Sequence, residues 1–218
     1  MNAPADELEL RARIVRVAQA LDEAGFCPSK SGNVSCRHRD GLLITPSGLP
    51  YAVMRPGDIV ALDLAGKVRA GSGKPSSEWP FHTTIYRARP DAQAIVHTHS
   101  PMATALSCAR KGIPAFHYMI ALCGGPDVRC ADYATFGTQA LADNAVRGLE
   151  GRKAVLLANH GVIALGATLE GAHTIAAEVE NLARQYLALL AAGLKPAILG
   201  KAEMKRVAEK FAGYGKVG

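Results

Sequence analysis

The spacing of apolar residues along the chain predicts two long helices. Over residues 5–25 the apolar side chains recur at helical intervals, and the segment closes on a glycine, which readily takes the left-handed conformation that ends a helix. Over residues 168–192 they form a broad apolar face of the kind that packs on a core. Shorter helices are predicted over residues 79–88 and 101–108.

Short apolar runs between these helices predict strands. Two of them, separated by a polar turn, are typical of a hairpin, and two later runs each lead directly into a histidine. A chain that mixes strands and helices in this way favours an α/β sandwich over a bundle of helices. The predicted strands cover residues 33–36, 41–44, 59–62, 94–97 and 154–157.

Length and composition indicate one globular domain over residues 1–218. A chain of 218 residues with 49% hydrophobic and 20% charged residues can bury a substantial core. No apolar stretch reaches the roughly 18 residues that a membrane span needs, and the N-terminus lacks the core of a signal peptide. We therefore expect a soluble cytoplasmic protein. The five cysteines are odd in number and lack zinc-ribbon spacing, which argues against a disulfide framework or a Cys-rich metal site.

The formal charge of +6 is compatible with an anionic, phosphorylated substrate. The lysines and arginines are scattered along the sequence, whereas a nucleic-acid-binding protein usually gathers them in runs or patches. We therefore expect neither a nucleic-acid partner nor a membrane partner.

Two histidines at the end of a predicted strand are the sharpest chemical signal. His97 and His99 are two residues apart, and on an extended backbone such side chains point to the same face, where they can bind one metal ion. His160 ends a second apolar strand and can supply a third nitrogen, which leaves zinc an open position for a substrate. The alternative is that these are surface or core-edge histidines without a ligand.

Several small polar residues beside glycines suit an anion. Ser76 and Ser77 precede a predicted helix, so their hydroxyls and the nearby backbone amides can hold a phosphate while Glu78 reaches the metal site. Glu78 could equally cap that helix. The loops at residues 31–33 and 45–48 each place a polar side chain next to a glycine that lets an oxyanion approach the backbone.

Taken together, these segments resemble the class II aldolase and adducin family, and most of all its members that cleave L-fuculose 1-phosphate. The likeness runs from the first helix to Tyr214. The matching segments, in order, are SGNVS (31–35), LITPSG (43–48), PSSEW (75–79), AIVHTH (94–99), IPAFHYMI (113–120), YATFG (133–137) and NHG (159–161).

The resemblance implies a central, mostly antiparallel sheet flanked by helices, and a fourfold-symmetric homotetramer with active sites between neighbouring subunits. It implies Zn²⁺, or another divalent ion such as Mn²⁺ or Co²⁺, held by His97, His99 and His160. Glu78 would be the fourth ligand and, once substrate displaces it, the catalytic acid/base. Tyr118 and Tyr214 would act near the aldehyde. The residues implied in phosphate binding are Gly32, Asn33, Ser47, Gly48, Ser76 and Ser77.

The implied reaction is reversible cleavage of a ketose 1-phosphate to dihydroxyacetone phosphate and an aldehyde. Relatives that act as pentulose-5-phosphate 4-epimerases or as sugar-acid phosphate decarboxylases are the alternative. The epimerases resemble one another in carrying Asp where this chain has Glu78, which favours the aldolase. A non-catalytic adducin-like module is disfavoured because the three histidines and Glu78 are all retained.

Four residues depart from the fuculose-phosphate pattern: Pro80 stands in place of an arginine, Phe116 of an aliphatic residue, and Leu122 and Cys123 of alanines. A more apolar wall on the aldehyde side would suit a deoxy or alkylthio aldehyde. This leads to the hypothesis that the substrate is 5-deoxyribulose 1-phosphate or 5-methylthioribulose 1-phosphate.

Overall fold

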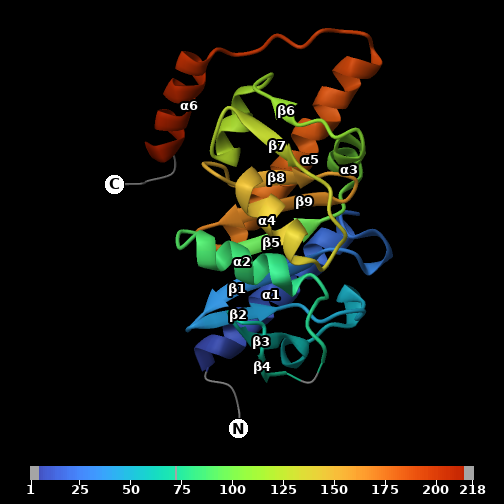
Figure 1. Cartoon of the computed structure of the whole chain (residues 1–218), viewed down its shortest axis with the longest axis vertical. Helices are drawn as coiled ribbons and strands as arrows, with labels where there is room; N and C mark the ends of the chain where they lie inside the picture. Colours follow the sequence, from blue (N-terminus) through green and yellow to red (C-terminus); the bar gives the residue numbers. More distant parts are fainter. Residues whose placement is uncertain (1–4, 72, 214–218) are drawn as a thin grey trace.

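The computed structural model describes residues 5–71 and 73–213. In this part of the chain, one sheet of nine strands extends through the molecule in the order β4-β3-β2-β1-β5-β9-β8-β7-β6 (Figure 1). Neighbouring strands are antiparallel except for β7 and β8, which are parallel. The predicted α/β architecture, a central mostly antiparallel sheet flanked by helices, is confirmed.

The strands are short, and the helices range from eight residues in α3 to 23 in α5. The strands are β1 (Asn33–His38), β2 (Gly41–Ile44), β3 (Val60–Asp63), β4 (Val68–Ala70), β5 (Ala94–Thr98), β6 (Ile113–Pro114), β7 (Asp127–Ala131), β8 (Ala154–Leu157) and β9 (Gly161–Gly166). The helices are α1 (Ala5–Glu23), α2 (Trp79–Ala88), α3 (Pro101–Cys108), α4 (Gln139–Gly148), α5 (Leu169–Ala191) and α6 (Lys201–Gly213). No helix in the described ranges is long and apolar enough to cross a bilayer.

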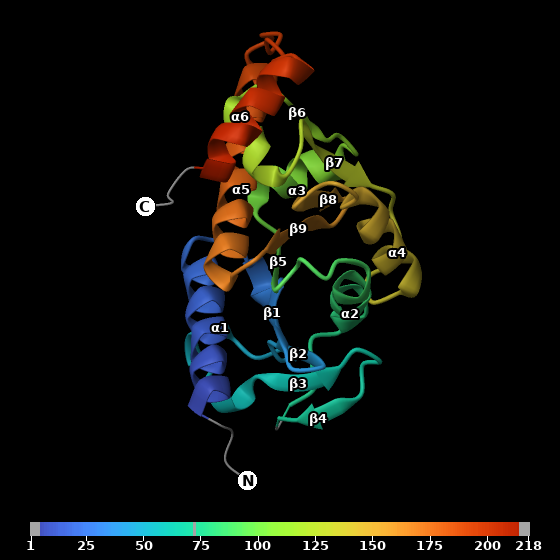
Figure 2. The ribbon, with the colours of Figure 1, turned by 90° about the vertical axis from the view of Figure 1, so that its left-hand side faces the viewer.

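Helices cover both faces of the sheet, so the molecule has three layers (Figure 2). Helices α1, α3 and α5 pack on one face, and α2 and α4 on the other. Side chains along β5 alternate between these two cores: Ala94 and Val96 face α5, while Ile95 faces α2. The alternation places His97, fully buried, on the α2 side, where its ring packs against Phe81.

The predicted elements agree closely with the structure where the sequence pattern is strong. Helices α2 and α3 have the predicted bounds, and α1 ends at Glu23, shortly before Gly25 turns the chain with φ +75°. Elements outside the predicted set are β4, β6, β7, β9, α4 and α6. Strand β9 is apolar throughout and follows β8 after three residues, so its pattern does not separate it from β8.

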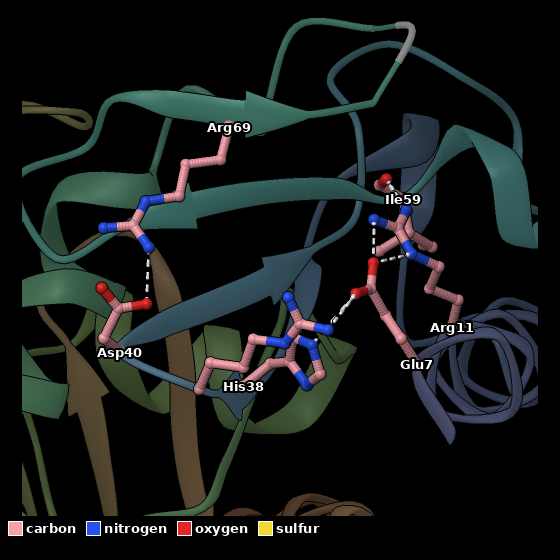
Figure 3. A network of polar contacts seen from close by, with 7 residues as sticks. Glu7, Arg11, His38, Asp40, Ile59 and Arg69 are labelled. Atoms are coloured by element: carbon pink, nitrogen blue, oxygen red, sulfur yellow. Dashed lines mark hydrogen bonds and ion pairs between the residues drawn. The ribbon is translucent and has the colours of Figure 1, made fainter. Parts of the chain in front are cut away.

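Helix α1 is fastened to the sheet by a buried ion-pair network (Figure 3). Glu7 accepts hydrogen bonds from Arg11 Nε at 2.9 Å and Nη2 at 2.7 Å, and its second oxygen lies 3.1 Å from Nε2 of His38, at the end of β1. Arg11 also donates to the carbonyl of Ile59, the residue directly before β3. The network therefore ties the first helix to two strands.

Candidate metal centre and active site

The pairing of β5 with β9 brings the predicted histidines together. His97 is the fourth residue of β5, and His99 follows the end of that strand. His160 lies in the tight turn between β8 and β9, where Asn159 takes a left-handed backbone conformation with φ +56°. Because β9 pairs with β5, with Val162 opposite Thr98, the β8–β9 turn lies beside the end of β5. All three imidazoles therefore gather where these inner strands of the sheet end.

Two glycines allow the backbone to close around these histidines. A Cβ on Gly161 would lie 2.4 Å from the carbonyl oxygen of Thr98, and a Cβ on Gly32, where φ is +84°, would lie 2.7 Å from that of His97. Neither approach leaves room for a side chain. Gly32 was expected only to bind an anion, and no role was assigned to Gly161; the close approaches show that both glycines also set the packing of the histidine loops.

The carboxylate of Glu78 lies between the imidazoles of His97 and His160. One carboxylate oxygen, Oε2, is 3.1 Å from Nε2 of His97, and the other, Oε1, is 3.1 Å from Nε2 of His160. Nε2 of His97 is in turn 3.0 Å from Nε2 of His99, and the ring centroids of each histidine pair are 4.9 Å apart. One ligand atom from each of the four residues lies within 4.8 Å of the others.

The donor atoms in this cluster fit a divalent metal ion. Nδ1 of His97 lies 2.9 Å from the carbonyl oxygen of Val162, which can only accept, so Nδ1 carries the hydrogen and Nε2 presents a lone pair to the cluster. Nitrogen lone pairs that face one another at 3.0 Å repel unless a proton or a cation lies between them. Three imidazoles and a carboxylate form a ligand set that zinc accepts.

The protonation states favoured by the site also suit a metal. Burial by itself raises the pKa of the Glu78 carboxyl, but the imidazoles of His97 and His160 outweigh it and hold that pKa below its usual range. Burial, together with the neighbouring imidazoles, lowers the pKa of His99 to about 3. At neutral pH the carboxylate is therefore ionised and His99 is neutral, which are the forms that bind metal.

The structure also addresses the alternative in which Glu78 only caps α2. Glu78 occupies the N-cap position of this helix, but its side chain makes no capping hydrogen bond. Its carboxylate instead accepts a hydrogen bond of 2.9 Å from the side-chain amide of Asn33 on β1. The side chain is therefore directed toward the histidines and the sheet.

A cavity of about 300 Å³ opens onto the cluster. Two loops that form its wall are held side by side: Ser47 donates its backbone N–H to Lys74, and Ser76 donates its own to Thr45. The cavity brings together all six residues that were expected to bind phosphate. Its lining comprises Lys30, Ser31, Gly32, Asn33, Pro46, Ser47, Gly48, Ser76, Ser77, Glu78, His99, Tyr133, Ala134, Phe136, Asn159 and His160.

Sequence reasoning missed some residues of this cavity. Lys30 adds a positive charge to the cavity wall. It follows Ser29 in a turn where both residues have left-handed φ angles, 58° for Ser29 and 64° for Lys30. The usable signal was a lysine directly before a Ser-Gly-Asn loop. Tyr133 and Phe136, both more than half exposed, lie in the segment 133–137, to which no role was assigned.

Of the two tyrosines expected near the aldehyde, Tyr118 is not among the described residues that line this cavity. Tyr118 begins a short 3₁₀ helix, η4 (Tyr118–Cys123), where its half-exposed ring stacks on His117 and on Phe211 of α6. It borders a separate cavity of about 900 Å³ between η4 and α6. Tyr214 lies outside the described residues. Within one chain, Tyr118 and Glu78 thus border different cavities.

Comparison with known proteins places this site in a family. Residues 12–187 match the Class II Aldolase and Adducin N-terminal domain. The chain belongs to the class II aldolase and adducin family. This match confirms the resemblance seen in the sequence. Class II aldolases are metal-dependent, and the cluster of Glu78 and three histidines is a group that could hold a metal ion.

Individual relatives of this class II aldolase match over nearly their whole length. A 5-methylthioribulose-1-phosphate/5-deoxyribulose-1-phosphate aldolase of Rhodospirillum rubrum is 50% identical over 212 residues, covering 97% of this chain and 95% of that protein. An L-fuculose phosphate aldolase of Haemophilus influenzae is 44% identical over 207 residues, 95% of each chain. A solved L-fuculose 1-phosphate aldolase superposes with a TM-score of 0.91 at 42% identity, covering 96% of this chain and 98% of that one. The predicted enzyme class, a lyase, is confirmed.

Proposed function

We propose that this chain is a zinc-dependent aldolase that reversibly cleaves a ketose 1-phosphate to dihydroxyacetone phosphate and an aldehyde. The observation that carries the proposal is that a possible metal site and a possible phosphate site lie side by side. Glu78 and three imidazoles form a metal-ligand cluster, and the cavity that opens onto it has a wall of serines, glycines and one lysine suited to a phosphate. The relatives named above act on substrates of this class.

The residues divide the work between the two ends of the dihydroxyacetone-phosphate half. His97, His99 and His160 would hold the ion, which supplies Lewis-acid stabilisation of the negative charge that develops at the C2 oxygen. Gly32, Asn33, Ser47, Gly48, Ser76 and Ser77 would hold the phosphate. Glu78, buried at the cluster, would carry the proton to and from C3. Zinc is favoured because three imidazole nitrogens and one carboxylate oxygen suit its four-coordinate geometry.

Residues 1–218 would act as one domain within a cytoplasmic homotetramer whose active sites lie between subunits. The proposal that active sites are shared between subunits is supported by the position of Tyr118, which is half exposed and borders a cavity other than that of Glu78. Tyr118 and Tyr214 of one subunit would then reach the aldehyde end of a neighbour's site, where one of them accepts the proton of the C4 hydroxyl during cleavage.

The aldehyde would be deoxy or alkylthio, as in 5-deoxyribulose 1-phosphate or 5-methylthioribulose 1-phosphate. The 50% identity to an enzyme named for these substrates supports this choice. Of the residues that depart from the fuculose-phosphate pattern, Phe116 borders the same cavity as Tyr118, whereas Cys123 is fully buried in the core. The apolar wall would therefore depend on Phe116 rather than on Cys123.

The test is release of dihydroxyacetone phosphate from fuculose, ribulose, 5-deoxyribulose and 5-methylthioribulose 1-phosphates, with and without a chelator. Chelator-sensitive release, fastest with the last two substrates, is the expected result, and Glu78→Gln should lose at least about 100-fold in kcat while still binding inorganic phosphate. No release from any substrate by zinc-loaded protein would refute the aldolase assignment and favour a decarboxylase or epimerase. Full activity in Glu78→Gln would refute its acid/base role.

A further inference from the structure

A continuous chain of buried hydrogen bonds leads away from the carboxylate of Glu78. Asn33 donates its side-chain amide to Oε2 of Glu78 at 2.9 Å, and its side-chain oxygen faces Nε2 of His82. Nδ1 of His82 lies 2.7 Å from the hydroxyl of Ser35, which is 2.8 Å from the hydroxyl of Tyr86. Each of the five residues is more than nine-tenths buried.

The chain is built from the periods of two elements. Asn33 and Ser35 are two residues apart on β1, so both side chains point to the face of the sheet that α2 covers. His82 and Tyr86 are four residues apart on α2, so both face β1. This interdigitation follows from the packing of α2 on the sheet, and no residue in it belongs to the predicted site except Asn33 and Glu78.

The orientation of the Asn33 amide sets the direction of the other hydrogen bonds in this network, because its nitrogen donates to Glu78 and its oxygen faces His82. A carboxylate only accepts, so Asn33 must present its nitrogen to Glu78 and its oxygen to His82. His82 must then carry its hydrogen on Nε2. Burial, and secondarily His97, lower the pKa of His82 to about 3, so its Nδ1 is an acceptor for Ser35, and Tyr86 in turn donates to Ser35.

The two oxygens of Glu78 therefore differ. Oε2 is fixed by Asn33, whereas Oε1 faces His160 and has no aligned hydrogen-bond donor among the described residues. We propose that His82, supported by Ser35 and Tyr86, is a positioning residue that orients Asn33, which in turn holds Oε2 of Glu78 so that Oε1 is the oxygen that transfers the proton at C3.

This inference rests on the proposed aldolase function. In the synthetic direction, carboxylate Oε1 would take a proton from C3 of dihydroxyacetone phosphate. The C3–H bond breaks and its electron pair forms the C2–C3 double bond of the enediolate, the π pair of the C2 carbonyl moves onto the C2 oxygen, and an O–H bond forms on Glu78. The reverse step returns the proton to C3 and regenerates the carboxylate. In D₂O, exchange of the Glu78 proton with solvent would place deuterium at C3 without any aldehyde.

The rate at which the C3 proton of dihydroxyacetone phosphate exchanges in D₂O can be followed by ¹H NMR with zinc-loaded protein. This rate isolates the proton transfer at C3, the step that the buried hydrogen-bond network is inferred to serve. His82→Phe removes the donor to Asn33 but keeps an aromatic ring, and we expect exchange to slow at least about tenfold while KM and bound zinc change less than about threefold. His82→Gln retains an N–H donor and should restore most of the rate.

Ile85→Val is the matched control, because Ile85 is fully buried on the same helix and has no part in the chain. Its expected exchange rate is that of the unmodified protein. Should His82→Phe slow exchange only in proportion to lost zinc or lost folded protein, the residue would be structural and the proposal would fail. A folded, zinc-loaded His82→Phe with unchanged exchange would overturn it as well. Tyr86→Phe, which removes the far end of the chain, should slow exchange by about two- to fivefold.

A second measurement does not depend on activity and so separates this inference from the proposed function. Long-range ¹H–¹⁵N NMR of ¹⁵N-histidine-labelled protein reports the tautomer of each imidazole. The structure requires a neutral His82 with its hydrogen on Nε2 at pH 7. A hydrogen on Nδ1, or a charged ring, would overturn the inferred direction of the chain even in an enzyme that cleaves its substrate.

Discussion

At the scale of single residues, the candidate site depends on how each imidazole is held. His97 is fully buried, and its Nδ1 is committed to the carbonyl of Val162, so its Nε2 can face only the cluster. His99 and His160 are partly exposed and border the cavity. A buried, oriented ligand next to two more accessible ones is the arrangement expected of a metal site that must leave room for a substrate.

Removing the most strongly held ligand should release the metal. For His97→Ala we expect at least about a tenfold loss of zinc affinity, since loss of a group that only supports a ligand already costs about tenfold or more. Metal analysis after dialysis against a weak chelator measures this loss. His173→Ala is the control, because His173 lies on α5 away from the cluster. Stoichiometric zinc in His97→Ala would show that the ligand assignment is wrong.

Lys30 is the residue we expect to sense the charge of the phosphate. Replacing it by asparagine keeps a residue that tolerates its left-handed φ of 64° but removes the charge. The inhibition constant for inorganic phosphate should rise about fivefold, a change in the range of one exposed ion pair, and Lys30→Arg should restore it. Lys67→Asn, in the β3–β4 turn, serves as the control. Equal inhibition of Lys30→Asn and the unmodified protein would place Lys30 outside the phosphate site.

At the scale of elements, the packing of helices on the sheet decides which side chains meet. Helix α2 aligns His82 and Tyr86 with β1, and α5 contributes Glu180, whose buried carboxylate accepts the backbone N–H groups of Met102 and Ala103 at the start of α3. This contact satisfies unpaired amides at a helix N-terminus and fixes the chain shortly after His99. Packing between α5 and α3 thus helps to position His99, although Glu180 is hydrogen-bonded to the backbone of α3 and not to His99.

The network of Glu7, Arg11 and His38 should make the attachment of α1 depend on pH. Burial raises the pKa of Glu7, but Arg11 and then His38 outweigh it, so the pKa lies below its usual value. A carboxyl whose pKa is lower in the folded state contributes stability above its unfolded pKa, and this contribution is lost as pH falls through the folded pKa. The protein should therefore lose stability below about pH 4.5 partly through Glu7.

Glu7→Gln measures this contribution. Breaking a buried pair should lower the free energy of unfolding by about 3 kcal/mol at pH 7, determined by urea denaturation. The difference between the variant and the unmodified protein should shrink as pH is lowered, because both then carry an uncharged group at this position. A difference that stays constant down to pH 3 would show that the carboxylate charge does not stabilise the fold.

At the scale of the whole molecule, the question is how Tyr118 could act on the same substrate as Glu78. The two residues border different cavities of one chain, and the half-exposed ring of Tyr118 lies against α6, a helix in the upper part of the molecule in Figures 1 and 2. Sites shared between neighbouring subunits of a closed oligomer would resolve this separation, since each site would take residues from two chains.

Complementation between two inactive variants tests this arrangement. Glu78→Gln and Tyr118→Phe, each strongly impaired alone, should form mixed tetramers on co-expression, in which about a quarter of the shared sites combine both native residues. Activity should therefore recover to about a quarter of that of the unmodified protein. If the co-expressed mixture never exceeds the two separate variants, Glu78 and Tyr118 do not meet across an interface.

The sequence by itself determined the chemical types at the site and most of the elements that carry them. Apolar runs ending in His97 and His160, and a Ser-Ser-Glu sequence before a helix, are local patterns, because strand and helix periods depend on near neighbours. For the same reason the helices α2 and α3 were predicted with their observed bounds. Strand β9 was not, because an apolar run close behind another carries no local boundary signal.

Only the tertiary structure decided how these residues combine. The pairing of β5 with β9 brings His160 beside His97, and the packing of α2 on β1 links Glu78 to Asn33 and His82. The tertiary structure also places Tyr118 on a different cavity from the one that Glu78 borders. These contacts join residues far apart in the chain, and strand register and helix docking set them through burial of a shared core. A local pattern specifies which face a side chain occupies, but not what stands opposite it.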